Sequence, residues 1–80
     1  MKINVDTPLK QQEITELLEA QTTPIYKCLG HPNNMRTQLQ FEVSEIPDGV
    51  DAVAYTKNLI KSQDYGKSIF FRVLEDGKNW

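Results

Sequence analysis

One pair of residues has the spacing of a metal-binding or nucleophilic site. Cys28 and His31 are separated by two residues, and they are the only cysteine and the only histidine among the 80 residues. Structural zinc takes four ligands and catalytic zinc takes three and a water molecule, so carboxylates or a second chain would have to complete a site. A histidine can also activate a cysteine, but nothing marks an orienting third residue or an oxyanion nest. We therefore predict no metal, no cofactor and no catalytic residue, and an enzyme is not the favoured class.

A turn-rich loop, Gly30–Arg36, carries polar side chains that suit recognition. The side chains in question are His31, Asn33, Asn34 and Arg36. Such groups can bind an anion or the carboxylate of a partner protein, and loops on rigid scaffolds often carry function. The alternative is an ordinary solvated turn, because Asn, Gly and Pro are common turn residues.

The charge balance and the hydropathy exclude several classes of protein. Nine Lys and Arg residues face eleven Asp and Glu residues, which leaves a net charge of −2 and no basic stripe of the kind that nucleic-acid binders carry. No apolar run approaches the roughly 20 residues of a membrane helix. The residues after Met1 form no signal-peptide pattern, and one unpaired cysteine suits a reducing compartment. We expect a single cytoplasmic domain over residues 1–80 that binds neither membrane nor nucleic acid.

An alternating pattern identifies the strand around which the fold is built. In Thr37–Ser44, the apolar residues Leu39, Phe41 and Val43 alternate with polar ones. This period of two is typical of a strand with one face in a core and the other in water. The same pattern predicts shorter strands at Met1–Asp6 and Ser68–Leu74.

A further strand is predicted at Ile25–Leu29, but the sequence allows two orientations for it. Either Ile25 and Leu29 face the core, or Tyr26 and Cys28 do. A strand with so little preference between its two faces suits the edge of a sheet, where the intervening lysine also discourages aggregation.

Two helices are predicted from capping residues and helical spacing. The first begins with Thr7 as N-cap and Pro8 as the first helical residue, and it runs to about Ala20. The second covers roughly Val50–Ser62, with either Asp48 or Asp51 as its N-cap. In both segments the apolar residues repeat at the spacing of one helix face.

The resulting order of elements is β-α-β-β-α-β. Two right-handed crossover units of this kind interleave into a ferredoxin-like α+β fold, a two-layer sandwich with a four-stranded antiparallel sheet and both helices on one face. The first and third strands are central in that arrangement. The topology by itself hosts many unrelated functions.

The uncovered face of the sheet is the predicted interaction surface. We expect it to include Tyr26, Phe70, Arg72 and Leu74. Large apolar groups exposed to water favour burial against another surface. That surface would be either the terminal segment with Trp80 or a second copy of the chain. RNA-binding sheets of this topology stack bases on aromatic residues of the central strands, and the corresponding residues here are asparagine, glutamine and glutamate.

These observations favour a small non-enzymatic protein-interaction module. We expect it to form a homodimer through the open sheet face or the last strand, while the loop Gly30–Arg36 serves any further recognition. The alternative is a regulatory domain that binds a small ligand at the seam of a dimer.

Overall fold

The computed structural model describes residues 1–76, apart from the side chain of Asn33. Within that range the strands are β1 (Lys2–Asp6), β2 (Ile25–Gly30), β3 (Gln38–Ser44) and β4 (Arg72–Glu75), and the helices are α1 (Gln11–Glu19) and α2 (Ala52–Lys61). Two 3-10 turns, η1 (Pro32–Asn34) and η2 (Tyr65–Lys67), precede β3 and β4. The expected contribution of Trp80 lies outside the described residues.

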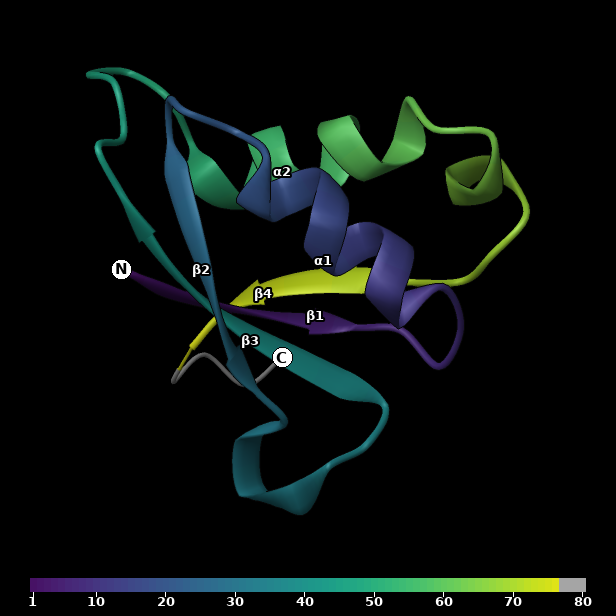
Figure 1. Ribbon diagram of the computed structural model, residues 1–80. Coiled ribbons are helices and arrows are strands. Elements are labelled where there is room, and N and C mark those ends of the chain that lie inside the picture. Colours follow the sequence, from purple (N-terminus) through teal and green to yellow (C-terminus); the bar gives the residue numbers. More distant parts are fainter. Residues whose placement is uncertain (77–80) are drawn as a thin grey trace.

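The four strands form one antiparallel sheet in the order β2-β3-β1-β4. Both helices lie on the same side of this sheet, as Figure 1 shows. The prediction of a ferredoxin-like α+β sandwich with the first and third strands at its centre is therefore confirmed. We call the side of the sheet away from the helices the open face.

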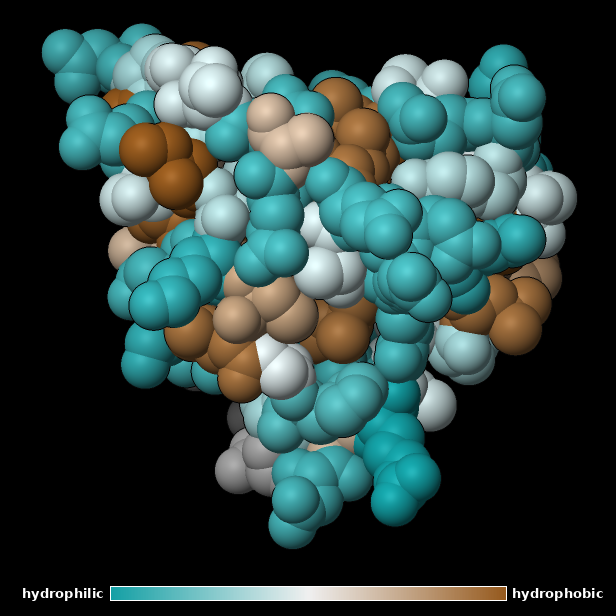
Figure 2. Space-filling view, in the orientation of Figure 1, coloured by the Kyte–Doolittle hydropathy of each residue, from teal (hydrophilic) through white to brown (hydrophobic). Residues whose placement is uncertain are grey.

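The core lies between the helices and the two central strands. Leu39, Phe41 and Val43 of β3 are buried there, as the alternating pattern predicts. Ile3 and Val5 of β1 are buried beside them, and the helices add Ile14, Leu18 and Ile60. Hydrophilic groups cover most of the surface seen in Figure 2, and the apolar groups on it lie in separate small areas.

The orientation of β2 is decided by Tyr26. Its side chain is 3% exposed and meets the ring of Phe41 edge to face, with ring centroids 6.4 Å apart. Cys28 shares this inner face, whereas Ile25 and Leu29 are 44% and 43% exposed on the open face. Assigning Tyr26 to the interaction surface is therefore wrong.

A buried chain of hydrogen bonds explains why Tyr26 turns inward. The Thr56 hydroxyl donates to the Ala52 carbonyl over 2.7 Å, which uses its only hydrogen. The Tyr26 hydroxyl, 2.8 Å from the Thr56 oxygen, is therefore the donor in the second bond. A tyrosine can enter a core when its hydroxyl has such a partner.

Because Tyr26 is buried, the fold should lose stability at alkaline pH. Burial raises the pKa of Tyr26 above its ordinary value of 10.0, because the phenolate would lose its hydration. The folded pKa exceeds the unfolded one, so this contribution is fully present below 10.0 and is lost as the pH rises through the folded pKa. Urea unfolding at increasing pH should show this loss.

The variant Tyr26→Phe isolates the effect, because burial also raises the pKa of Tyr65. At neutral pH the variant should lose only about 1 kcal/mol, since Thr56 keeps its bond to Ala52. At pH values above the ordinary tyrosine pKa, the free energy of unfolding of the variant should fall less steeply with pH than that of the wild type. Equal steepness in the two proteins would contradict the assignment to Tyr26.

The two helices begin differently from each other. Of the two N-cap candidates for the second helix, Asp48 and Asp51, the structure uses Asp51, whose carboxylate accepts from the amides of Val53 and Ala54 over 3.0 and 3.3 Å. The prediction for Thr7 is wrong, because α1 begins at Gln11 and its N-cap is Lys10.

The sheet displaces the start of α1. The amide of Thr7 donates to the carbonyl of Thr37 over 2.7 Å, so the pairing of β1 with β3 continues past Asp6. Thr7 is fully buried, and its hydroxyl donates to the Leu9 carbonyl instead of capping a helix. Lys10, with a φ of 61°, then turns the chain into the helix.

The last strand is shorter than predicted and begins later. Ser68 belongs to the turn after η2, where its amide donates to the Tyr65 carbonyl over 3.1 Å. Pairing with β1 begins only at Arg72. Phe70 therefore precedes β4 and does not belong to the sheet. Phe71 and Val73, which alternate with Phe70 and Arg72, do pack toward the core.

Candidate functional site

The centre of the open face is a closed polar network. The Asn4 and Gln40 side-chain amides both donate to the Asp76 carboxylate, over 3.2 and 3.1 Å, and Gln40 also donates to Asn4 over 3.2 Å. Nearby, a hydrogen bond from the Met1 amine holds the pKa of Glu42 below its usual value. Asn4 and Gln40 thus bond within this network, and both of their bonds to Asp76 end on the same carboxylate oxygen, Oδ1.

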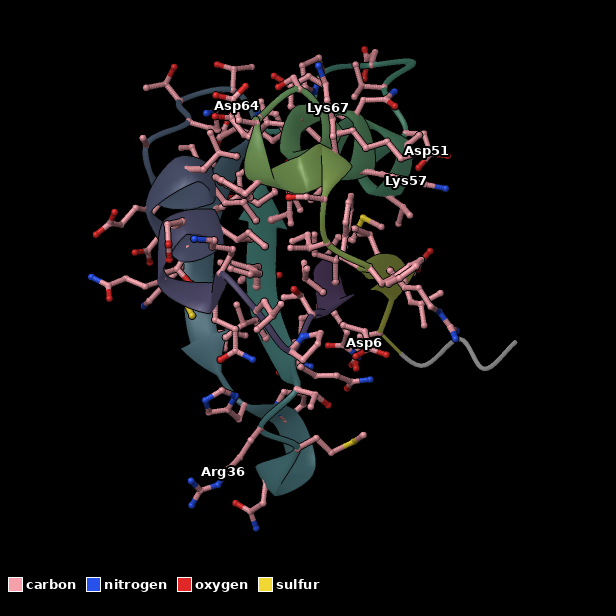
Figure 3. All side chains as sticks on the ribbon, turned by 90° about the vertical axis from the view of Figure 1, so that its right-hand side faces the viewer. Asp6, Arg36, Asp51, Lys57, Asp64 and Lys67 are labelled. Carbon is pink, nitrogen blue, oxygen red and sulfur yellow. The ribbon has the colours of Figure 1, made fainter. Side chains whose placement is uncertain are left out.

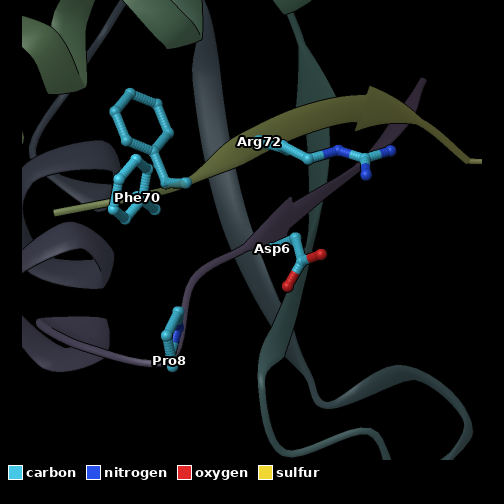
Figure 4. A pocket seen from close by; sticks show the side chains of 5 residues that line it. Asp6, Pro8, Phe70 and Arg72 are labelled. Carbon is cyan, nitrogen blue, oxygen red and sulfur yellow. The ribbon is translucent and has the colours of Figure 1, made fainter.

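The most exposed large apolar side chain among residues 1–76 lies at the β4 edge, by which we mean the outer side of Arg72–Glu75 together with Phe70. The Phe70 side chain is 95% exposed. Beside it lies a hollow of about 280 Å³ lined by Asp6, Pro8, Phe70, Phe71 and Arg72, which Figure 4 shows in close-up. Arg72 and half-buried Leu74 continue from it along the open face.

The backbone of the β4 edge is available for pairing. The amide of Asp76 donates to the Lys2 carbonyl over 2.9 Å, so Leu74 and Arg72, two and four residues earlier, also turn their backbone groups toward β1. Val73 and Glu75 therefore direct theirs outward. Within residues 1–76 these outward groups have no backbone partner.

The opposite edge of the sheet is protected. The outward amide of Cys28 in β2 donates to the carboxylate of Glu19 over 3.1 Å. Glu19 ends α1, which packs against β2. A side chain that occupies an edge amide hinders the addition of another strand, so β2 is the less open of the two edges.

The loop residues form a second surface, which we call the polar hollow. It has a volume of about 470 Å³ and is lined by Gln11, His31, Asn34 and Arg36. The structure thus brings together three of the four predicted loop residues. The side chain of Asn33 lies outside the described part of the structure.

Sequence reasoning missed Gln11, which holds the hollow together. Its side-chain amide donates to the carbonyls of Thr7 and Arg36, over 2.8 and 2.6 Å, and so joins the start of α1 to the loop before β3. His31 is fixed from the other side, because its Nδ1 lies 2.8 Å from the Gln38 carbonyl oxygen. No local sequence pattern predicts this role for Gln11, because the role depends on α1 beginning at Gln11 and not at Pro8.

The structure does not join Cys28 and His31 into a reactive pair. Cys28 is half-buried on the inner face of β2, whereas His31 bonds to Gln38 in the polar hollow. Among the described residues, no group of three or more His, Cys, Asp or Glu side chains is placed to hold a metal ion. The helices found in residues 1–76 are too short and too polar to cross a membrane.

Comparison with protein-family models, curated proteins and solved structures found no match to this chain. The candidate function therefore rests on the β4 edge and the polar hollow. The β4 edge suits a protein partner, and the polar hollow has the size of a small-molecule site.

Proposed function

We propose that this chain is a small cytoplasmic protein-interaction module that forms a homodimer through the β4 edge. The observation that carries the proposal is Phe70, which is 95% exposed beside the hollow of the β4 edge and a strand whose outer side has no partner among residues 1–76. Burying a phenylalanine side chain contributes about 1.5–3 kcal/mol, so leaving it in water favours a partner. The single free cysteine suits a reducing compartment.

The backbone supports strand addition as the mode of contact. Val73 and Glu75 present amides and carbonyls at an edge, and these groups have no backbone partner within the described part of the chain. A second strand laid antiparallel against them would extend the sheet and satisfy those groups. The short length of β4 means that side chains must add to the affinity, and Phe70 is placed to do so.

Charge and shape favour a second copy as the partner. In a two-fold pairing that centres Leu74 on the axis, the two Leu74 side chains meet on the open face, and Arg72 faces Asp76 of the other copy. An edge with an apolar centre flanked by opposite charges is self-complementary, as a two-fold interface requires. The same edge thus supplies both halves of the contact.

Sedimentation velocity on three proteins tests the proposal. The wild type should form a dimer as its concentration rises through the micromolar range. Phe70→Asp should weaken the dimer at least about a hundred-fold, because a two-fold contact loses about 1.5–3 kcal/mol of apolar burial from each copy. Phe70 is almost fully exposed, so the variant should keep the melting temperature that the wild type has at concentrations where it is monomeric.

Leu29→Asp is the matched control, since Leu29 is 43% exposed at the protected edge of the sheet. It should dimerise like the wild type. If Leu29→Asp dissociates the dimer and Phe70→Asp does not, the copies meet through the open face and the β4 edge is the wrong surface. A wild type that stays monomeric would remove the proposal altogether.

A further inference from the structure

The lining of the polar hollow differs in charge from the protein as a whole. The chain carries a net charge of −2, yet Arg36 is the only formally charged side chain among the described residues that line this hollow. Among residues 1–76, no carboxylate oxygen lies within 4.0 Å of its guanidinium. In Figure 3, Arg36 projects from the end of the molecule opposite to Asp51, Lys57 and Asp64. The guanidinium is therefore free to bind an oxyanion in two parallel hydrogen bonds.

The start of α1 adds to this preference for an anion. Gln11 is the first residue of the helix, and its N-cap Lys10 forms no side-chain cap, so no such bond shields the amides of the first turn. A helix start carries a partial positive charge. The acidic residue of that turn, Glu13, is paired with Lys10 at 3.5 Å.

The other lining groups define what must accompany the anion. Both hydrogens of the Gln11 side-chain amide are used by backbone carbonyls. The group that remains for a ligand is Oε1, which is an acceptor. The Gln38 carbonyl can only accept, so Nδ1 of His31 carries the proton in the bond between them. In the neutral ring the other nitrogen, Nε2, is then an acceptor like Oε1 of Gln11. The hollow thus combines one cation with two acceptors that are already held in position.

We propose that the polar hollow binds a hydroxyl-bearing oxyanion of the sugar-phosphate class. The phosphate binds Arg36, and neighbouring hydroxyl groups donate to Gln11 and His31. An amino acid fits less well, because its ammonium group would find no carboxylate in the lining. The volume of about 470 Å³ lies within the range of roughly 300–1,000 Å³ that small-molecule sites occupy, and it leaves room beyond a single phosphate.

Nuclear magnetic resonance titration with four probes tests this assignment. The probes are glucose 6-phosphate, inorganic phosphate, glucose and serine. Glucose 6-phosphate should shift the amide signals of Gln11, His31, Asn34 and Arg36 in a saturable manner. Inorganic phosphate should bind the same residues more weakly, and glucose and serine should leave them unchanged.

Two variants separate a built site from general attraction to positive charge. Arg36→Gln should weaken binding of glucose 6-phosphate at least about ten-fold, the usual effect of losing a charge-assisted bond. The Arg36 side chain forms no ion pair among residues 1–76, so the melting temperature should not change. Lys57→Gln, on α2 at the far end of the molecule, should bind like the wild type.

Equal binding by wild type and Arg36→Gln would overturn the proposal, and so would shifts that spread over surface lysines. The absence of any saturable shift would do the same. The proposal does not depend on the homodimer, because Phe70→Asp leaves the hollow intact and should bind glucose 6-phosphate as the wild type does. Failure of one proposal is thus distinguishable from failure of the other.

Discussion

Replacing Phe41 by alanine is expected to lower the free energy of unfolding by about 3–5 kcal/mol. Phe41 lies at the middle of β3 and is fully buried. It pairs with Ile3 of β1 on one side and Cys28 of β2 on the other, and its ring contacts Tyr26. The change removes apolar burial and leaves a cavity that the two neighbouring strands cannot close.

Such a loss is large for a domain of 80 residues, because typical folding stabilities are about 5–15 kcal/mol in total. Urea denaturation followed by circular dichroism measures it directly. Phe70→Ala is the matched control, with the same chemical change at a side chain that is 95% exposed. The monomer of that variant should stay within about 0.5 kcal/mol of the wild type. Similar losses in the two variants would mean that Phe41 is not the centre of the core.

Replacing Gly66 by alanine is expected to cost about 3 kcal/mol, the upper end of the usual cost of overpacking. Gly66 is the middle residue of η2 and is buried against the last turn of α2. A Cβ there would overlap the carbonyl oxygen of Ile60 and lie only 2.8 Å from its carbonyl carbon and 3.0 Å from Cα of Lys61. All three atoms belong to backbone, so no side chain can move aside.

Gly49→Ala separates this clash from the general cost of replacing glycine. Gly49 has a φ of 81°, but no atom lies within 4 Å of an added Cβ. The change should cost about 1 kcal/mol, from the left-handed backbone alone. Urea denaturation of both variants measures the two losses in the free energy of unfolding. If Gly66→Ala is no less stable than Gly49→Ala, η2 can shift away from α2 at little cost.

The close approach at Gly66 also concerns the proposed interface. Only three residues separate Gly66 from Phe70, so the packing of η2 on α2 sets where the chain enters β4. A shift of η2 should therefore weaken association as well as stability. That consequence can be read from the same sedimentation measurement that tests Phe70→Asp.

Much of the fold follows from patterns within short stretches. The alternation of Leu39, Phe41 and Val43 predicts β3 and its buried face, because strand side chains alternate between the two sides of a sheet. Asp48 and Asp51 mark the start of α2 to within one turn, and Asp51 is the cap, because it bonds to the amides two and three residues ahead of it. In each case the deciding contact is local or periodic.

The errors at α1 and Phe70 have a different origin. Thr7 and Pro8 carry a valid helix-start signal, but the bond from Thr7 to Thr37 keeps the chain in the sheet. Phe70 follows the alternating pattern of a strand, but pairing with β1 begins at Arg72. Local preference differs by only about 1 kcal/mol between conformations, so a tertiary contact can override it.

By itself, the sequence determined the order of elements, the inner faces of β1 and β3, and the loop that carries His31, Asn34 and Arg36. Only the tertiary structure decided that Tyr26 faces the core, since its partner Thr56 lies thirty residues away. It also decided that Gln11 completes the polar hollow and that Phe70 stands in water beside a free edge. The reason is physical: periodicity shows which side of an element avoids water, whereas a site forms where elements distant in the chain meet.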